Sequence, residues 1–392
     1  MKVALIHDWL TGMRGGERCL EAFCEIFPDA DIYTLVHTPQ SVSPTIESHA
    51  IHTSFIQHLP NSQKKYQYYL PLFPMAIASF DLSGYDLILS SSHCVAKGVR
   101  VPKGVCHIAY LFTPMRYIWD QYENYFNHET ASMPVRVAMK MVQPWLKRWD
   151  VGSNNDIFSF VAISDFVANR IKNYYGRMAE VIYPPVDLER FSAASSNNGF
   201  YLIVTALVPY KRVDLAILAF NRLKLPLHII GSGQDEIRLK RMAGDTITFL
   251  GRQSDDEISV AYANCRALIF PGEEDFGIVP LEAMASGKPV IAYGKGGALE
   301  TVIPLGSSSH PQEAPTGLFF YQQTTESLCD AVLYFEKHKA QFDPEKIRRH
   351  VTSFRADRFK KEMLRSIEKT LHVFQADRPL RAERPPQKEK DA

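Results

Sequence analysis

The sequence predicts an α/β protein with two similar halves, and three observations lead to this prediction. Short apolar segments alternate with helix-period segments over residues 3–183, and the alternation restarts at residue 201. A Ser/Asn/Ala-rich stretch, residues 192–199, separates the two series and is typical of a linker. The length of 392 residues exceeds what one hydrophobic core usually serves. We therefore expect two doubly wound domains, 1–191 and 199–349.

The first half opens with a strand, a glycine loop and a helix. Val3–Ile6 is a short apolar run, and Gly12, Gly15 and Gly16 separate it from a helical pattern that continues through Phe27. A doubly wound sheet begins in this order. The further predicted strands of this half are Ile32–Val36, Leu87–Ser90, His107–Leu111, Phe158–Ile163 and Val181–Tyr183.

The second half repeats the alternation and ends in a helix and a tail. A long helical pattern runs from about Ile347 to Phe374. The segment Arg378–Ala392 is rich in proline and charge and has no apolar period, which predicts a disordered tail over 378–392. The predicted strands of this half are Tyr201–Thr205, Leu227–Ile230, Ile247–Phe249, Ala267–Phe270 and Val290–Ala292.

Composition and charge narrow the classes of function. Hydrophobic residues make up 46% and charged residues 22% of the chain, which are globular values. The net charge of +1 and the lack of a basic stripe argue against nucleic-acid binding. His7 and Asp8 interrupt the N-terminal apolar run, which favours a strand over a signal peptide. The cysteines lack metal-site spacing, so we expect reduced, mostly buried thiols in a cytoplasmic protein: Cys19, Cys24, Cys94, Cys106, Cys265 and Cys329.

The segment Pro271–Pro289, PGEEDFGIVPLEAMASGKP, carries the strongest functional signal. It places Glu274 and Glu282 eight residues apart around a tight turn between a predicted strand and a predicted helix. Gly277 lets the backbone approach a ligand, and the free N–H groups of the helix start suit a phosphate. Glu274 can accept hydrogen bonds from sugar hydroxyls, and Glu282 can hold a ribose diol. Together these groups fit a nucleotide-sugar.

Lys211 is the second candidate. It follows a predicted strand and the turn 208–210, at the start of a predicted helix. A cation there can neutralise a diphosphate leaving group, which is the main electrostatic demand of glycosyl transfer from a nucleotide-sugar. A solvated lysine at a helix start is the alternative interpretation.

These motifs resemble those of a known family. The two glutamates, with Phe-Gly after the first and Pro-Leu before the second, are similar to the Glu-x7-Glu motif of retaining glycosyltransferases of family 4, which have the GT-B fold. The resemblance covers nearly the whole chain. Its other motifs, HDWL, GGER, YDLILSSSH, TPMRYIWD, YPPVD and LVPYKRVDLAI, resemble a bacterial surface-polysaccharide branch that includes mannosyltransferases.

The resemblance implies a fold and an activity. The fold is α/β, GT-B, with two Rossmann-like domains facing a cleft and a C-terminal helix, about 350–375, returning to the first domain. The activity is that of a retaining glycosyltransferase that moves a hexose from a nucleotide-sugar during cell-surface polysaccharide synthesis. The expected donor is GDP-mannose, with a UDP-sugar as the alternative, and the acceptor is a glycan or a polyprenyl-linked glycan. The donor is expected to bind mainly to the second domain and the acceptor to the first.

The resemblance also assigns residues. Glu274 and Lys211 are the expected catalytic residues. No cofactor and no metal are expected, and we interpret the Asp-x-Asp pattern at Asp29 as a turn. For Arg252, a solvated arginine is an equal alternative to a contact with the base. The expected donor-binding residues are Gly15, Gly16, Lys211, Arg212, Gly231, Arg252, Glu274, Phe276, Gly277, Ile278, Val279 and Glu282.

Two positions depart from the pattern of the family. Ala206 stands where many members carry an arginine five residues before the lysine, so Arg212 is the candidate replacement. Phe112 stands where relatives often have a histidine near the reacting sugar, and we predict that the nearby His107 is a packed histidine. These departures keep open a non-catalytic nucleotide-sugar-binding protein. A Rossmann oxidoreductase is disfavoured because the glycine pattern at Gly231 lacks the third glycine.

Two basic-aromatic segments, 64–73 and 139–149, raise the hypothesis of peripheral membrane contact at the inner face of the membrane. They combine Lys and Arg with Tyr, Trp and Met, a composition that can lie at a lipid interface. Packing of both segments on the first domain is the alternative.

Overall fold

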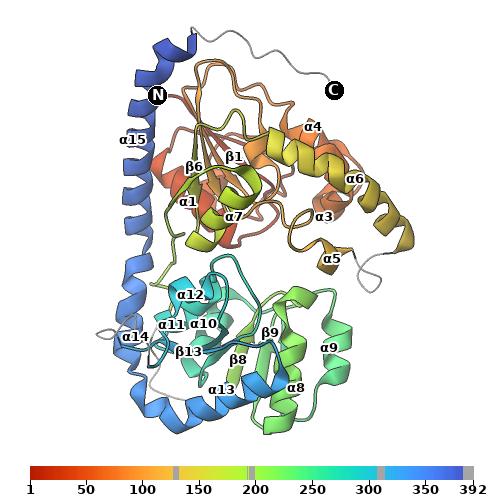
Figure 1. Ribbon diagram of the computed structural model, residues 1–392, viewed down its shortest axis with the longest axis vertical. Helices are drawn as coiled ribbons and strands as arrows, with labels where there is room; N and C mark the ends of the chain where they lie inside the picture. The colour runs from red at the N-terminus through yellow and green to blue at the C-terminus, as the bar shows by residue number, and fades with distance from the viewer. Residues whose placement is uncertain (127–131, 192, 194–198, 307–313, 383–392) are drawn as a thin grey trace.

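Two parallel sheets organise the chain (Figure 1). The computed structural model describes residues 1–126, 132–191, 193, 199–306 and 314–382. The first sheet has the strand order β3-β2-β1-β4-β5-β6-β7, and the second has the order β10-β9-β8-β11-β12-β13. Helices cover both sheets, as the crossovers between parallel strands require. The predicted class, two Rossmann-like α/β domains, is confirmed.

The first domain follows the predicted alternation closely. The central strands β1, β4 and β5 are buried along their whole length, which explains their apolar sequences. Its strands are β1 Val3–His7, β2 Asp31–Thr34, β3 Ile51–Thr53, β4 Leu87–Ser92, β5 Cys106–Leu111, β6 Ser159–Ala162 and β7 Ala179–Val181. Its helices are α1 Gly15–Ile26, α2 Pro44–Glu47, α3 Ser62–Lys65, α4 Phe73–Ile77, α5 Tyr122–Tyr125, α6 Met133–Gly152 and α7 Asp165–Tyr175.

The second domain is built in the same way. The sequence prediction lacks β3 of the first domain, which has a single apolar residue, Ile51, and β13 of this domain. The strands are β8 Tyr201–Val204, β9 Leu227–Ile230, β10 Ile247–Gly251, β11 Leu268–Phe270, β12 Val290–Tyr293 and β13 Gly317–Phe320. The helices are α8 Val213–Leu223, α9 Glu236–Met242, α10 Asp255–Asn264, α11 Ile278–Ala285, α12 Ala298–Thr301 and α13 Thr325–His338.

The C-terminal helices run from the second domain to the first. Helix α14, Pro344–Val351, packs on α11, and α15, Ala356–Ala382, continues along the first domain (Figure 1). There Phe359 packs on Phe23 and Tyr110, with ring centroids 5.5 Å apart in both pairs. The chain therefore passes between the two domains twice.

Two sequence predictions concern segments at the margin of the described structure. Helix α15 continues to Ala382, past the predicted start of the tail at Arg378. The rest of the predicted tail, 383–392, lies outside the described residues. The predicted linker, 192–199, also lies outside them except for residues 193 and 199.

The buried side chains agree with two further predictions. All six cysteines are buried. His107 is fully buried in β5, where its Nε2 lies 2.8 Å from the Ser90 hydroxyl and burial lowers its pKa to about 3. His107 is therefore a packed histidine. Among the described residues, no helix is both long and apolar enough to cross a lipid bilayer.

Candidate active site

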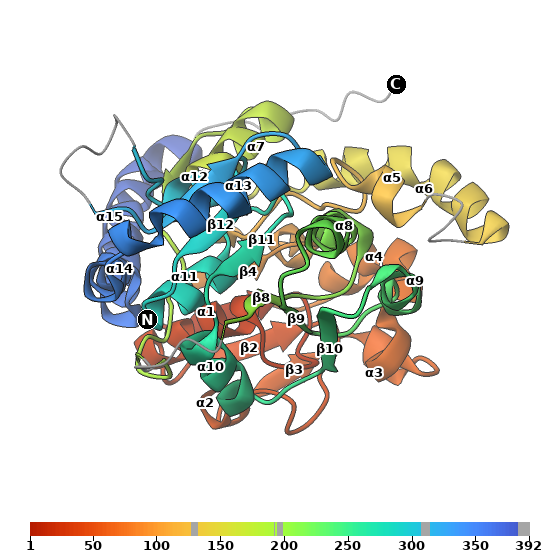
Figure 2. The same cartoon turned by 90° about the horizontal axis from the view of Figure 1, so that it is seen from below.

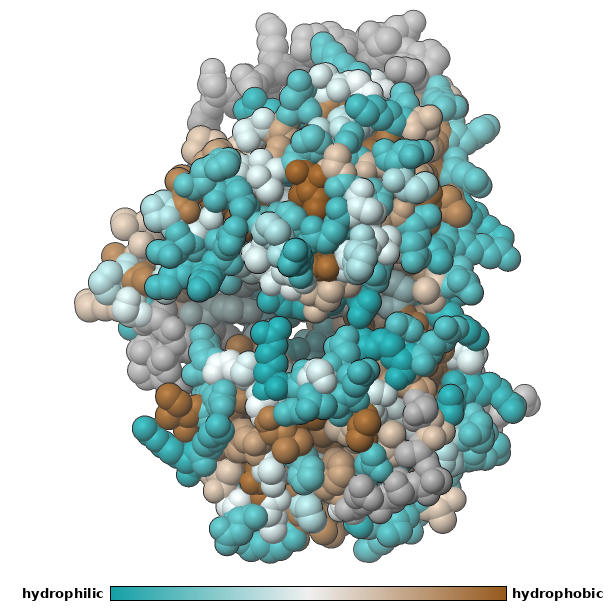
Figure 3. Space-filling view, turned by 180° about the vertical axis from the view of Figure 1, so that it is seen from behind, coloured by the Kyte–Doolittle hydropathy of each residue, from teal (hydrophilic) through white to brown (hydrophobic). Residues whose placement is uncertain are grey.

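A cleft of about 640 Å³ lies between the carboxyl ends of the two sheets. The strand order reverses between β1 and β4 in the first sheet and between β8 and β11 in the second. Open α/β sheets bind ligands at such reversals, outside the carboxyl ends of the strands. The loops that follow β1, β4, β5, β8 and β11 all contribute to the lining. From behind, Figure 3 shows a hollow between the two halves of the molecule, with mostly hydrophilic residues at its edges.

The wall from the second domain is built around the start of α11. Strand β11 ends at Phe270, and the chain turns through residues 271–277 into the helix. Gly277 has a φ of 94°, a conformation that glycine adopts readily and other residues rarely do. Residues 274–279 line the cleft, so the unsatisfied amides of the first helical turn lie beside it. This turn can hold an anion.

The two predicted catalytic residues lie together. Lys211 and Glu274 form an ion pair, with side chains 13% and 18% exposed. Lys211 belongs to a 3-10 turn, Pro209–Lys211, and not to the following helix α8, because Arg212 has a left-handed conformation with a φ of 54°. Each charge of the pair compensates the other. A diphosphate at the start of α11 would compete with Glu274 for the ammonium group of Lys211.

The predicted glycine loop reaches the cleft from the first domain. Gly15 and Gly16 are both lining residues at the start of α1. A side chain on Gly15 would meet Cδ1 of Ile278, on the opposite wall, at 2.6 Å. Glycine at this position therefore lets the two walls approach each other.

Glu282 lies in a smaller pocket, of about 140 Å³, that shares Gly15 and Ile278 with the cleft. The Tyr262 hydroxyl donates a hydrogen bond of 2.9 Å to its carboxylate. Burial raises the pKa of Glu282 to about 7, although the hydrogen bond from Tyr262 opposes this shift. The carboxyl group is thus about one helical turn beyond the anion-binding amides, where a ribose is predicted.

Five predicted donor-binding residues do not line the cleft: Lys211, Arg212, Gly231, Arg252 and Glu282. The Arg212 guanidinium lies 3.3 Å from both a carboxylate oxygen of Asp214 and the side-chain oxygen of Gln323. Gly231 follows β9 with a φ of 134°, and its N–H donates to the carbonyl of Gly251 at 2.8 Å. Arg252 is exposed beyond β10. Arg212 is therefore turned toward its own domain in this arrangement.

The wall from the first domain contains a histidine–carboxylate pair that the sequence analysis misses. The sheet register sets His7 beside Ser91 and Ser92 beside Leu111, so the next residues of these strands, including Asp8 and His93, meet at one edge. Polar residues at the ends of neighbouring predicted strands were the available signal.

Asp8 organises this edge. Its buried carboxylate accepts the backbone N–H groups of residues 93–96 at 2.7 to 3.0 Å, and Nδ1 of His93 lies 3.1 Å from Oδ2. Burial opposes ionisation, but His93 and its hydrogen bonds lower the pKa of Asp8 to about 2. His93 lines the cleft and packs edge-on against Trp9, with ring centroids 4.5 Å apart. Phe112, the departure from the family pattern, also lines the cleft, with its ring 6.2 Å from that of His93.

Asp275 joins the two walls. Its carboxylate pairs with Arg116 and with Nη1 of Arg170, the latter at 2.5 Å, and both arginines belong to the first domain. The Ser164 hydroxyl donates to the Asp275 carbonyl at 2.5 Å. A second link is Glu300, which accepts the first N–H groups of α7 at 2.8 and 2.9 Å. These ion pairs and hydrogen bonds between the two domains thus set the width of the cleft.

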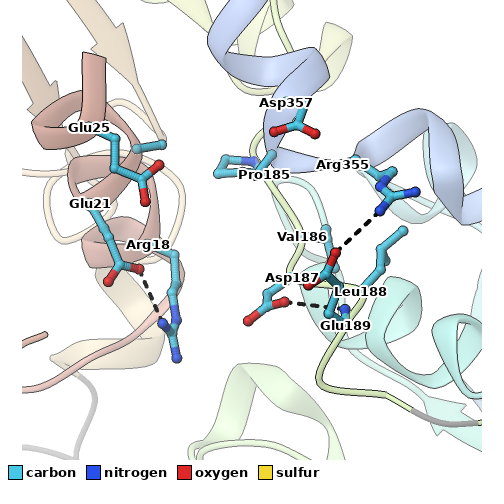
Figure 4. Close-up of a pocket in the computed structure, with 12 residues that line it drawn as sticks. Arg18, Glu21, Glu25, Pro185, Val186, Asp187, Leu188, Glu189, Arg355 and Asp357 are labelled. Carbon is cyan, nitrogen blue, oxygen red and sulfur yellow. Dashed lines mark hydrogen bonds and ion pairs between the residues drawn. The ribbon is translucent and has the colours of Figure 1, made fainter. Parts of the chain in front are cut away.

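A second cavity, of about 260 Å³, lies where the two chain crossings meet α1 (Figure 4). It is lined by two arginines, which pair with Glu21 and Glu189, and by five carboxylates in total. An excess of carboxylates repels a diphosphate, so this cavity does not suit a nucleotide-sugar. The carboxylates shown are Glu21, Glu25, Asp187, Glu189 and Asp357.

The comparison with families and curated proteins points to glycosyl transfer. Residues 187–352 match the family described as glycosyl transferases group 1. An uncharacterised glycosyltransferase of Methanocaldococcus jannaschii is 33% identical over 156 residues, which are 38% of this chain and 44% of that protein. A GDP-mannose-dependent alpha-(1-6)-phosphatidylinositol monomannoside mannosyltransferase of Mycobacterium tuberculosis is 29% identical over 214 residues, 46% of this chain and 53% of that protein. The chain thus spans about half the length of these relatives, and the matches support a transferase of the glycosyltransferase class.

The comparison with solved structures confirms the GT-B fold. The complex of Anabaena HepE with UDP-glucose has a TM-score of 0.68 at 16% identity, covering 94% of this chain and 100% of that one. Sucrose-phosphate synthase from Thermosynechococcus elongatus has a TM-score of 0.69 at 16% identity, covering 95% and 100%. At these identities the likeness concerns the fold.

Proposed function

We propose that the chain is a retaining glycosyltransferase that moves mannose from GDP-mannose to a glycan or polyprenyl-linked glycan in cell-surface polysaccharide synthesis. One observation carries the proposal. Lys211 pairs with Glu274, and Glu274 and the first residues of α11 line a cleft whose opposite wall belongs to the first domain. This combination offers positive groups for a diphosphate and a carboxylate for sugar hydroxyls within one site.

The reaction places separate demands on these groups. The transition state of glycosyl transfer has oxocarbenium character on the sugar and growing negative charge on the departing diphosphate. Lys211 and the amides of residues 277–279 stabilise the second charge. Glu274 orients the sugar hydroxyls, and Glu282 holds the ribose. We expect no metal to be needed for this chemistry. Among the described residues, no group of three or more His, Cys, Asp and Glu side chains is placed to hold one.

The choice of GDP-mannose rests on the curated relatives. The Mycobacterium tuberculosis protein is named as GDP-mannose-dependent, and an O-antigen chain mannosyltransferase of Salmonella typhimurium is 26% identical over 204 residues, 50% of this chain and 57% of that protein. The solved structure of HepE contains UDP-glucose, so a UDP-sugar is the alternative donor.

A thermal-shift panel tests the donor. Its members are GDP-mannose, UDP-glucose, UDP-GlcNAc, UDP-galactose and NAD. A ligand that binds only the folded protein adds about 2.7 kcal/mol at roughly 100 times its dissociation constant, which raises the melting temperature measurably. A shift with GDP-mannose alone supports the proposal, and a shift with a UDP-sugar alone replaces the donor. A shift with NAD alone contradicts a glycosyltransferase.

A second assay separates an enzyme from a binding protein. A glycosyltransferase transfers the sugar of its donor to an acceptor, or slowly to water, and releases the nucleotide. A protein that only senses the donor binds it and releases no nucleotide. We expect nucleotide release that depends on Glu274. Binding without release under any condition would favour the non-catalytic alternative.

The surface of the first domain supports a lipid-linked acceptor at the inner face of the membrane. Helix α6 buries Met139 and Leu146 against the domain and leaves an apolar stripe outside. Helices α3 and α6 lie on the same side of the first domain in both cartoon views (Figures 1 and 2). The stripe consists of residues four positions apart that are 75%, 50%, 72% and 49% exposed: Met133, Val137, Met141 and Trp145.

Co-sedimentation with anionic liposomes tests this contact. Lys64 and Lys65 end α3, Arg148 is exposed on α6, and Lys147 lies over the Trp119 ring. Exposed basic side chains are attracted to anionic lipid. We expect the unchanged protein to bind, and a variant that neutralises Lys64, Lys65, Lys147 and Arg148 to stay in solution. The matched control neutralises four basic residues of the second domain, Lys337, Lys339, Lys346 and Arg349. No binding by the unchanged protein would exclude the contact.

A further inference from the structure

The second-domain wall of the cleft supplies little net positive charge. Among the described residues that line the cleft, those of the second domain include two carboxylates and no lysine or arginine. Lys211 is already paired with Glu274. The Arg212 guanidinium is turned to Asp214, and position 206 is an alanine. The amides at the start of α11 add only a partial positive charge. A diphosphate that gains negative charge as the sugar leaves is therefore better stabilised with a further cation.

Arg14 lies where the cleft meets the smaller pocket that contains Glu282. It directly precedes helix α1, and Arg14, Gly15 and Ile278 are the residues that line both cavities. The two domains approach closely here, since a side chain on Gly15 would meet Cδ1 of Ile278 at 2.6 Å. With the sugar at Glu274 and the ribose at Glu282, the diphosphate between them falls at this boundary.

The Arg14 guanidinium is free to bind a ligand. The residue is exposed, and within the part of the chain that the structure describes it forms no ion pair. Tyr66 is its hydrogen-bonding neighbour, which leaves other N–H groups of the guanidinium open. Glu17 is buried and accepts the backbone N–H of Arg14 at 3.1 Å. The other arginine that lines the cleft, Arg116, is paired with Asp275 and does not line the smaller pocket.

We propose that Arg14 binds the diphosphate of the nucleotide-sugar donor from the first domain, opposite Lys211 and the start of α11. The inference rests on the proposed function. A guanidinium presents its N–H groups in a planar fork that fits phosphate oxygens. It also stabilises the charge that grows on the diphosphate as the bond to the sugar breaks. The donor then contacts both domains at once, so its binding favours the arrangement in which the two walls face each other.

Calorimetry with GDP tests this contact. Arg14→Gln is expected to lower GDP affinity roughly 10- to 100-fold, the range of a charge-assisted hydrogen bond. Arg14→Lys keeps the positive charge and is expected to recover part of the affinity. Because salt screens an exposed charge, the loss in Arg14→Gln should be larger at about 0.05 M than at about 0.5 M salt. A residue that only supports the fold would not show this dependence on salt.

The matched control is Arg100→Gln. Arg100 is another exposed arginine of the first domain, but it does not line the cleft, so GDP affinity should stay unchanged. Full GDP affinity in Arg14→Gln, an equal loss in Arg14→Lys, or the same loss at both salt concentrations would overturn the role of Arg14 while the proposed function stands. UDP replaces GDP as the probe if the unchanged protein binds UDP alone. An unchanged protein that binds neither nucleotide would overturn both.

Discussion

The two walls of the cleft are built in different ways. The second-domain wall comes from two short segments, around Lys211 and from 274 to 279, and its groups are an ion pair and a helix start. The first-domain wall is assembled from the ends of β1, β4 and β5, with Asp8 and His93 separated by 84 intervening residues in the chain. One wall is local in sequence, whereas the other, which combines aromatic residues with Arg14, Glu17 and Arg116, is assembled by the sheet.

This difference bears on where the two substrates of the proposed transfer bind. A nucleotide diphosphate presents the same charges whichever sugar is attached, so one compact segment of amides, a cation and a carboxylate can serve it. An acceptor glycan offers rings and hydroxyls, which suit stacked aromatic faces and single hydrogen-bonding groups. For the proposed transfer we therefore expect the donor mainly on the second wall and the acceptor on the first. Changes in each wall should then affect different measurements.

The largest effect is expected from Glu274→Ala on the second wall. Removing one preorganised electrostatic group from an active site typically costs 10²–10³ in turnover, or about 3 kcal/mol. Glu274 contacts the sugar in the proposed complex, and its removal frees Lys211 for the diphosphate, so GDP affinity should stay equal or rise while turnover falls. Initial rates of GDP release and calorimetry with GDP measure the two quantities.

The matched control for Glu274 is its neighbour. Glu273 pairs with Lys295 at 3.1 Å and does not line the cleft, so Glu273→Ala should keep both turnover and affinity. Equal losses of turnover and GDP affinity in Glu274→Ala would remove the assignment of this carboxylate to the sugar.

An effect on stability, of similar size, is expected where the walls meet. Asp275→Ala leaves Arg170, whose side chain is only 10% exposed, without its buried carboxylate. Removing one partner of a buried ion pair costs about 3 kcal/mol or more, since the remaining charge stays desolvated. Denaturant unfolding followed by fluorescence should show this loss. Asp120→Ala removes the other, 35% exposed, partner of Arg170 and should cost less than about 1 kcal/mol. A similar loss in both variants would show that Asp275 does not dominate the contact between the walls.

The walls also differ in how far the sequence predicts them. The turn at Gly277, the helix after it and the two glutamates lie within one motif. The sequence alone therefore predicts that they lie close together. The Asp8–His93 pair does not, because it depends on which strands are neighbours and on a register that sets His7 beside Ser91. The resemblance to a family supplied the fold but no role for this pair.

Local backbone detail limits the prediction in the second wall as well. The sequence indicates Lys211 at a helix start, yet the left-handed conformation of Arg212 separates the 3-10 turn from α8. That conformation also directs the Arg212 side chain to Asp214 and Gln323. A residue with positive φ that is not glycine leaves no mark in the sequence, so the orientation of the two basic side chains could not be predicted.

The smallest effect, and the one that depends on pH, concerns Glu282 in the adjoining pocket. Its pKa of about 7 lies above the 4.5 of an unperturbed glutamate, so the folded protein holds the proton more tightly than the unfolded chain. Stability contributed by this carboxyl group is therefore fully present below about pH 4.5 and is lost as the pH rises to 7. Glu282→Gln removes this loss and keeps an acceptor for Tyr262. We expect the variant to be more stable by roughly 1 to 3 kcal/mol at pH 8 and nearly equal at pH 4. Urea unfolding at both pH values measures the difference, and a gain that is the same at both would show that folding does not shift the pKa of Glu282.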